Sequence, residues 1–206
     1  YDPSLVPWGE VGYAVYKRTY SRQTADGKTE EWEDTVDRVI DACRDQLNVG
    51  FTQFEEGELK KIMMELKGTV AGRFLWQLGT KTVDRLGLPS LQNCAFVVVD
   101  DPIRPFTWAF EMLMLGSGVG FNIQRENVYQ LPKVKNRVKV ERIDENDADF
   151  IVPDSREGWV ELLDRVLEAS FYQDGKGNDG FTFATHLIRP KGAPIKGFGG
   201  TASGSE

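Results

Sequence analysis

Cys94 is the residue in this chain whose type and setting best support chemistry. It lies in the apolar stretch LQNCAFVVV (91–99), directly after Asn93. A cysteine in a buried strand is usually a small apolar filler, yet asparagine is a poor strand residue and its presence needs a reason. A thiol that faces a cavity lined by glycine loops can act as a nucleophile or as half of a redox dithiol. Both interpretations stay open from the residues alone.

The glycine turn GSGVG (116–120) is the second candidate. It lacks the GxGxxG spacing and follows an expected helix, whereas the dinucleotide fingerprint follows a strand and opens a helix. Such a turn therefore serves either phosphate binding or the close approach of the backbone to a ligand or another strand. Because His186 is the only histidine, a histidine-based metal site and a Ser-His-Asp triad are not predicted, and no metal is expected. A Cys94–His186 pair remains a minor alternative.

The third candidate is the basic, glycine-rich segment RPKGAPIKGFGG (189–200). Three cations stand among its flexible glycines, and they are Arg189, Lys191 and Lys196. Mobile backbone N–H groups and a few cations suit a polyphosphate. The alternative is a surface loop that happens to be basic.

Composition narrows the classes of partner. The net charge of −7 argues against a broad nucleic-acid surface but not against a pocket for one nucleotide. No stretch approaches the roughly 18 apolar residues of a membrane span. Two cysteines do not form a disulfide framework, so a reducing, cytoplasmic setting is expected.

Helices are predicted to dominate the N-terminal region, residues 1–85. Residues 32–47 carry an apolar stripe at helical spacing that includes Cys43, which we interpret as a core residue. A second helix is predicted over 56–67, with Gly68 just beyond its end. The residues predicted to face inward from this second helix are Leu59, Ile62, Met63 and Leu66.

A βαβ unit is predicted to open the second region, residues 86–206. The stretch 91–99 is typical of a strand buried on both faces of a parallel sheet, and a mostly apolar helix (about 105–115) and the GSGVG turn lead to another strand. The alternation in VKNRVKVERI (134–143) indicates an exposed strand or hairpin. A helix is expected over 153–171, with Asp154 as N-cap and Glu157 completing a capping box. Residues 181–187 complete the pattern as a strand.

Several stretches, in order, resemble one family. They are PWGEVGYAVYKRTYSR, EEWEDTVDRVIDA, AGRFLW, LQNCAFVV, GSGVGFN, PDSREGWVELL and IRPKGAPIKGFGGTASG. Together they resemble the N-terminal portion of class II, adenosylcobalamin-dependent ribonucleotide reductases of the monomeric ribonucleoside-triphosphate reductase type. The resemblance implies an α/β fold in which the helical region precedes the first part of a ten-stranded α/β barrel. It also implies an insertion at about 126–187 that carries its own helix and replaces a partner subunit at an effector site.

The resemblance assigns roles to residues. Cys94 matches the first redox-active cysteine, which with a second cysteine delivers an electron pair to the ribonucleotide. Asn93, Ser117 and Gly118 match positions that line the substrate pocket. Ala71 falls near the substrate phosphates, where relatives often carry Ser or Thr, so no side-chain hydrogen bond is expected there. The residues expected to bind effector phosphates are Arg189, Lys191 and Lys196.

Cofactor and partners follow from the same resemblance. It implies adenosylcobalamin, with contacts mostly outside this chain, and a thiyl radical on a cysteine further along the family's order. The implied partners are a ribonucleoside triphosphate, a deoxynucleoside triphosphate effector, a dithiol reductant such as thioredoxin, and the C-terminal remainder as a continuation or a separate chain. Activity is expected to require that remainder. The alternative is a regulatory module that kept the effector site without catalysis.

Overall fold

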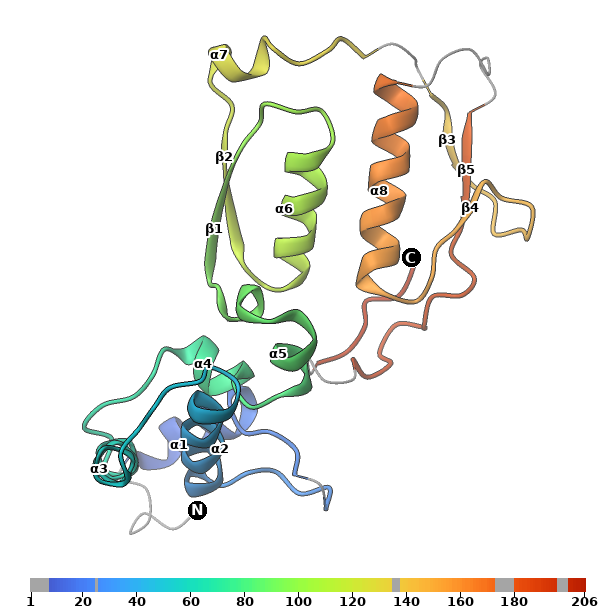
Figure 1. Cartoon of the computed structure of the whole chain (residues 1–206). Coiled ribbons are helices and arrows are strands. Elements are labelled where there is room, and N and C mark those ends of the chain that lie inside the picture. Colours follow the sequence, from blue (N-terminus) through green and yellow to red (C-terminus); the bar gives the residue numbers. More distant parts are fainter. Residues whose placement is uncertain (1–7, 25, 135–137, 173–179, 196–199) are drawn as a thin grey trace. The chain divides into compact units, whose positions relative to one another are not determined.

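The structure is a computed structural model that describes residues 8–24, 26–134, 138–172, 180–195 and 200–206. The chain forms two compact units, Tyr1–Gln92 (unit 1) and Asn93–Glu206 (unit 2), coloured in sequence order in Figure 1. The division falls a few residues after the boundary predicted between 85 and 86.

Unit 1 is helical in its described part. Its elements are α1 (Gly9–Thr19), α2 (Trp32–Asp45), α3 (Gln53–Met64), α4 (Gly72–Gln77), α5 (Lys81–Leu86) and the 3₁₀ helix η1 (Leu88–Leu91). Their apolar faces meet around α2, whose Trp32, Val36 and Val39 are almost fully buried. Such burial is the main stabilising contribution available to a unit of this size.

The helix predicted over 32–47 is confirmed as α2. It begins with a capping box, in which Glu31 accepts from the third helical N–H and Asp34 accepts from the Glu31 N–H. Cys43 is partly buried against the core, as predicted, and burial raises the pKa of its thiol. This cysteine is therefore a packing residue.

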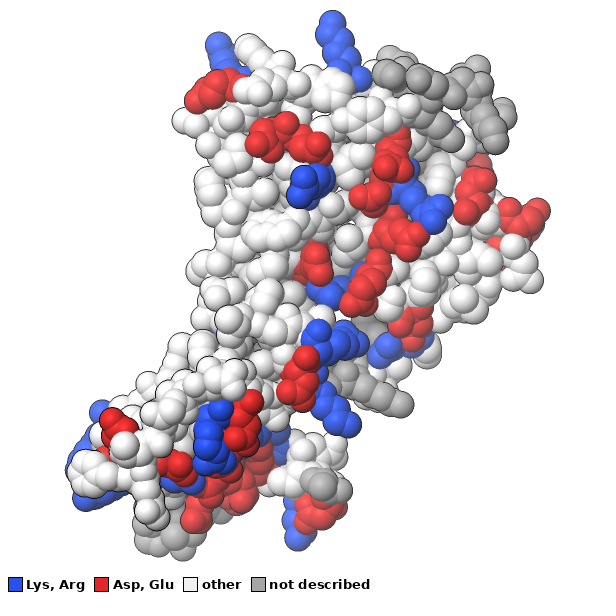
Figure 2. All heavy atoms as spheres, viewed as in Figure 1, with Lys and Arg blue, Asp and Glu red and all other residues white. Residues whose placement is uncertain are grey.

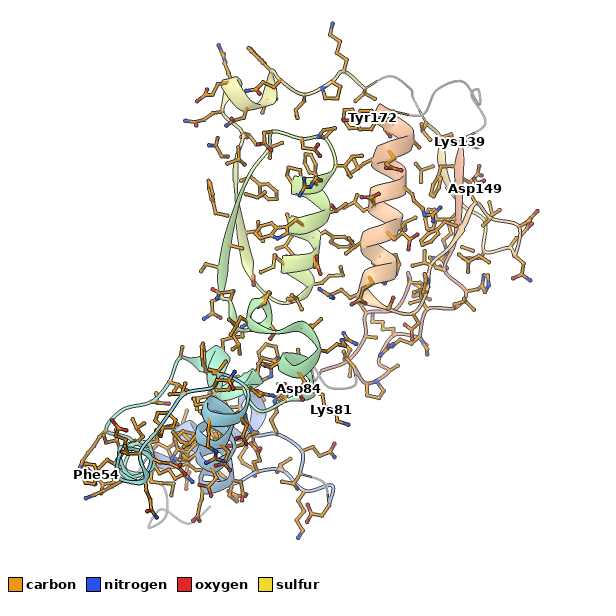
Figure 3. The ribbon with its side chains drawn as sticks, in the orientation of Figure 1. Phe54, Lys81, Asp84, Lys139, Asp149 and Tyr172 are labelled. Atoms are coloured by element: carbon orange, nitrogen blue, oxygen red, sulfur yellow. The ribbon has the colours of Figure 1, made fainter. Side chains whose placement is uncertain are left out.

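The second predicted helix is confirmed as α3, but it begins and ends three residues earlier than predicted. It begins at Gln53 because Thr52 and Glu55 form a capping box, a signal that the prediction of 56–67 missed. Phe54, next to this cap, is 76% exposed and is labelled in Figure 3.

The inward face and the end of α3 also differ from the prediction. Met63 is buried and Leu66 is partly buried, whereas Leu59 and Ile62 are exposed. The chain leaves the helix through Leu66, which has a φ of 54°, so Leu66 rather than Gly68 takes the left-handed position. Apolar residues at helical spacing thus mark the helix but not which of its faces is covered.

A buried polar network crosses unit 1 beside this core. Arg38 Nε donates to Glu30 Oε1 at 2.7 Å, and Thr35 Oγ1 donates to Glu30 Oε2 at 2.7 Å. The Arg38 guanidinium also donates to the carbonyl oxygens of Leu75 and Leu78. Burial alone would raise the pKa of Glu30, but the hydrogen bonds from Arg38 and Thr35 outweigh it and hold that pKa below its usual value.

Unit 2 combines helices with two small parallel sheets. Its elements are β1 (Cys94–Val98), α6 (Arg104–Met114), β2 (Gly118–Asn122), α7 (Arg125–Val128), β3 (Val140–Arg142), β4 (Phe150–Ile151), α8 (Arg156–Phe171) and β5 (Phe181–Ala184). Figure 1 shows α6 beside the β1–β2 sheet and α8 between α6 and the second sheet. Helix α6 contacts both strands of the first sheet, and α8 contacts α6 and β5. The layers therefore run sheet, helix, helix, sheet.

The predicted βαβ unit is confirmed as β1, α6 and β2, with the two strands parallel. The prediction that 91–99 is buried on both faces was wrong, because Phe96 is 64% exposed and Cys94 is also exposed. Successive side chains of a strand point to opposite faces. Cys94 and Phe96 therefore share one open face of the pair.

The second sheet has the order β3, β5, β4, and all its pairs are parallel. The described end of the segment 134–143 thus contributes an exposed strand, one of the two predicted alternatives, and this strand pairs in parallel with β5. The Asp149 carboxylate accepts from the Thr182 N–H and from Thr182 Oγ1, both at 2.8 Å. Asp149 is labelled beside this sheet in Figure 3. Of the strand predicted over 181–187, only Phe181–Ala184 is extended.

Candidate functional site

Cys94 opens β1 at the point where the two parallel strands begin. It stands opposite Gly118 in the register, and the Gly118 N–H donates to the Asn93 carbonyl oxygen at 2.9 Å. Ser117 precedes Gly118 and is only 3% exposed. The structure therefore brings together four of the predicted site residues at one end of the sheet, with the Cys94 thiol on the open face.

Three glycines explain how this end of the sheet is built. Gly116 has a φ of 83°, a left-handed conformation that lets the chain reverse from α6 into β2. Gly118 and Gly120 lie on the same open face as Cys94 and Phe96. A Cβ at Gly120 would lie 3.0 Å from Cδ2 of Phe96. At Gly120 the glycine thus allows close approach to the neighbouring strand, which is one of the two interpretations of GSGVG.

Ala71 lies in unit 1, at the N-cap position of α4. Its carbonyl oxygen accepts from the N–H groups of Phe74 and Leu75, and no side chain caps the helix. A serine or threonine could supply that missing cap or reach a ligand. Alanine offers only its backbone there.

The predicted effector cations lie after β5, and Arg189 has a carboxylate partner. Arg189 Nε lies 3.0 Å and 2.9 Å from the two carboxylate oxygens of Asp154. The hydrogen bond from this guanidinium holds the pKa of Asp154 below its usual range. Lys191 is exposed, and Lys196 lies outside the described residues.

Asp154 therefore does not cap α8, and that prediction was wrong. Ser155 is the N-cap, and its side chain accepts from the Gly158 N–H at 3.0 Å. Two neighbouring residues could each cap this helix, and Arg189 engages the first of them. No sequence pattern near 154 points to a partner 35 residues away.

A further polar link joins the helices of unit 2, and sequence reasoning missed it. Arg156 Nη1 donates to Glu111 Oε1 at 2.7 Å, and the Arg156 side chain is only 14% exposed. The link connects the start of α8 with α6, whose end leads through Gly116 to Gly118 beside Cys94. Three successive residues at the start of α8 thus have different partners. Asp154 binds Arg189 in the loop after β5, Ser155 caps α8 itself, and Arg156 binds Glu111 of α6.

The described residues form no evident binding site for a metal ion or for a corrin cofactor. No three His, Cys, Asp or Glu side chains converge among them, and His186 is exposed. An open pocket of about 480 Å³ lies beside α6 at the end of β1, with Asp100, Asp101, Arg104 and Trp108 in its lining. Two carboxylates and an open mouth do not fit a large corrin cofactor, so we derive no step through adenosylcobalamin.

Charged side chains of both signs are mixed on the surface. Figure 2 shows acidic and basic side chains interspersed over the face in view, without a broad basic area. Within the described ranges, each helix is too short or too polar to cross a bilayer.

Two family models match the chain. Residues 2–80 match the ribonucleotide reductase alpha domain, and residues 125–206 match the insertion domain of B12-dependent ribonucleotide reductase. Together the two matches flank the β1–α6–β2 unit that carries Cys94.

Curated relatives and a solved structure agree with these matches. The chain is 32% identical to the adenosylcobalamin-dependent ribonucleoside-triphosphate reductase of Lacticaseibacillus paracasei, over 96% of this chain and 34% of that protein. It is 34% identical to a probable reductase of the same name from Dictyostelium discoideum, over 97% of this chain and 29% of that protein.

A crystal structure of a B-12 dependent (class II) ribonucleotide reductase matches with a TM-score of 0.78 and 30% identity. The match covers 97% of this chain and 35% of the solved one. The chain thus spans about a third of the length of its relatives. In sequence and in fold, it belongs to the B12-dependent, class II ribonucleotide reductases.

Proposed function

We propose that this chain is part of an adenosylcobalamin-dependent ribonucleoside-triphosphate reductase and that Cys94 is one of its two redox-active cysteines. The observation that carries the proposal is the position of Cys94 at the start of β1, opposite Gly118, on an open face of the sheet. A reacting thiol needs access to its substrate, and the exposure of Cys94 supports this role. The other cysteine, Cys43, is partly buried in a helical core.

The proposed chemistry uses Cys94 as an electron donor. Two cysteine thiols are oxidised to one disulfide, and the two electrons and two protons that they lose reduce the ribonucleotide. The 2′-hydroxyl leaves as water, which gives a 2′-deoxyribonucleotide. An external dithiol such as thioredoxin then reduces the disulfide by thiol–disulfide exchange.

The rest of the proposed catalytic set lies outside this chain. Cys43 packs in the core of unit 1. We therefore assign the second redox cysteine and the radical-bearing cysteine to the part of the enzyme that corresponds to the other two thirds of its relatives' length. Strands β1 and β2 would be the first of a ten-stranded barrel, and the corrin contacts would lie on the remainder. We place the enzyme in the cytoplasm, where thiols stay reduced.

Substrate and effector are assigned to different parts of the chain. Asn93, Ser117 and Gly118, beside Cys94, are proposed to line the ribose and base side of the substrate pocket, while the backbone at Ala71 contributes near the phosphates. Arg189 and Lys191 are proposed to bind the phosphates of a deoxynucleoside triphosphate. Both residues directly follow the insertion at about 126–187. Lys196 keeps the same proposed role.

The test compares the two cysteines in the whole protein that carries this chain. Deoxyribonucleotide formation from a ribonucleoside triphosphate is measured with adenosylcobalamin and dithiothreitol. Cys94→Ser should stop multiple turnovers, because one thiol cannot form the disulfide. Cys43→Ser is the matched control and should keep most of the activity.

Two outcomes would contradict the proposal. Normal turnover of the Cys94→Ser variant would remove the redox assignment. Absence of reductase activity from the parent protein, with deoxynucleotide binding intact, would favour the regulatory module instead.

A further inference from the structure

The Asp154 carboxylate binds the guanidinium of Arg189, a group that the proposed effector site would use to bind phosphate. Arg189 Nε approaches both oxygens of that carboxylate, at 3.0 Å and 2.9 Å, and the Arg189 backbone N–H donates to one of them at 3.3 Å. Arg189 Nη1 also donates to the Pro194 carbonyl oxygen at 3.2 Å. Arg189 is thus bound by residues of its own chain.

The loop that carries Arg189 is closed on itself by backbone pairing. Gly192 N–H donates to the Ala202 carbonyl oxygen, and Ala202 N–H donates to the Ala193 carbonyl oxygen, both at 2.8 Å. Lys191 is exposed at the start of this paired segment and forms no ion pair with any residue in the described ranges. The loop therefore presents one cation held by a carboxylate and one that faces solvent.

We propose that Asp154 is an internal competitor for Arg189, which a polyphosphate must displace when it binds at this loop. The proposal rests on the assignment of Arg189 to ligand phosphates made above. It adds that Asp154 sets the affinity of this loop for polyphosphate. When a phosphate group binds the Arg189 guanidinium, the Asp154 carboxylate becomes solvated.

The exchange costs little because the ion pair is only partly buried. The side chains of Arg189 and Asp154 are 32% and 37% exposed, and ion pairs in such settings contribute little net stability. Arginine binds phosphate oxygens through two parallel, charge-assisted hydrogen bonds. A triphosphate can therefore compete successfully with a single carboxylate.

The Asp154 carboxylate stays electrostatically stabilised after it releases Arg189. It directly precedes Ser155, the N-cap of α8, so its charge lies near the positive end of a 16-residue helix. Arg156, two residues on, is held to Glu111 of α6. Because α8 is anchored in this way, we expect Arg189 and its loop to move, whereas Asp154 stays in place.

The experiment measures binding of inorganic tripolyphosphate by isothermal titration calorimetry, in the whole protein that carries this chain. Asp154→Asn should tighten binding about two- to fivefold, the factor that matches loss of an exposed ion pair. Asp147→Asn is the matched control, because Asp147 is an exposed acid of the same unit without an ion pair among the described residues. It should leave the affinity within about 1.5-fold of the parent.

A double-mutant comparison ties the effect to the guanidinium. In an Arg189→Gln background, Asp154→Asn should no longer change the affinity, and tripolyphosphate bound at other sites cancels from this comparison. Circular dichroism checks each variant for folding, and Asp154→Ser replaces the asparagine variant if that one does not fold.

Unchanged or weaker binding by the Asp154 variant would overturn the proposal. A gain that persists without Arg189, or a parent protein that does not bind tripolyphosphate, would overturn it as well. Reductase activity is assayed separately on the same preparations. A protein without reductase activity therefore refutes the proposed function and leaves the binding comparison readable.

Discussion

Gly158 gives a sharp test of how the start of α8 is built, because its replacement by alanine should destabilise the protein. Alanine is normally the better helix residue by about 1 kcal/mol. At Gly158, however, a Cβ would lie 2.6 Å from the carbonyl oxygen and 2.8 Å from Cδ of Pro153. Both atoms belong to the backbone or to a rigid ring, so the chain itself must move.

The expected magnitude follows from these two opposing effects. Forcing an extra carbon into a packed site costs about 1–3 kcal/mol, and the better helix propensity of alanine offsets up to about 1 kcal/mol of it. We expect Gly158→Ala to lower the free energy of unfolding by about 1–2 kcal/mol. The displaced segment includes Asp154 and Ser155, so the cap and the link to Arg189 should weaken together.

Gly57 provides the matched control within α3. It is exposed, and a Cβ there would meet no atom within 4 Å. Gly57→Ala should therefore stabilise the protein by about 0.5–1 kcal/mol. In urea unfolding followed by far-UV circular dichroism, the midpoints of the two variants should shift in opposite directions, by roughly 0.5–1 M for Gly158→Ala and about half as much for Gly57→Ala, for an m-value of about 2 kcal/mol/M. A Gly158→Ala variant as stable as the parent would refute the steric argument.

Three further predictions test other parts of the structure. Ser155→Ala should cost about 1 kcal/mol in thermal unfolding, because the α8 N-cap is lost; an unchanged Tm would contradict this cap. Iodoacetamide should modify Cys94 before Cys43 in mass spectra, because Cys94 is exposed and burial raises the pKa of Cys43; the reverse order would place the accessible thiol elsewhere. Glu30→Gln should cost about 3 kcal/mol at neutral pH, because it leaves Arg38 buried without its carboxylate. The depressed pKa of Glu30 stabilises the fold above about pH 4.3, and this contribution is lost as the pH falls through the folded-state pKa, so urea titrations of variant and parent should converge in acid.

Helix α2 and the β1–α6–β2 unit were predictable because their signals are local. An apolar stripe at helical spacing, an apolar β-branched run and a glycine turn each determine the backbone of their own segment. The motifs quoted from these segments also carried the family assignment, which the comparisons confirmed.

Faces and helix ends were less predictable because they depend on neighbours. Leu59 and Ile62 have the spacing of core residues, yet in α3 only the side chain of Met63 is well covered. At α8, Asp154 and Ser155 are both good caps, and the choice between them is made by Arg189, which lies far along the chain. Periodicity reports where an apolar stripe lies, but it does not report what packs against it.

The sequence by itself determined the family, helix α2, the β1–α6–β2 unit and the identity of Cys94 as the candidate thiol, because each rests on motifs or patterns that are local in the chain. Only the tertiary structure decided that Cys94 stands opposite Gly118, that Glu111 holds Arg156, and that Asp154 holds Arg189. Those contacts join residues separated by 24 to 45 positions. Their partners are selected by strand register and helix packing, which no local pattern encodes.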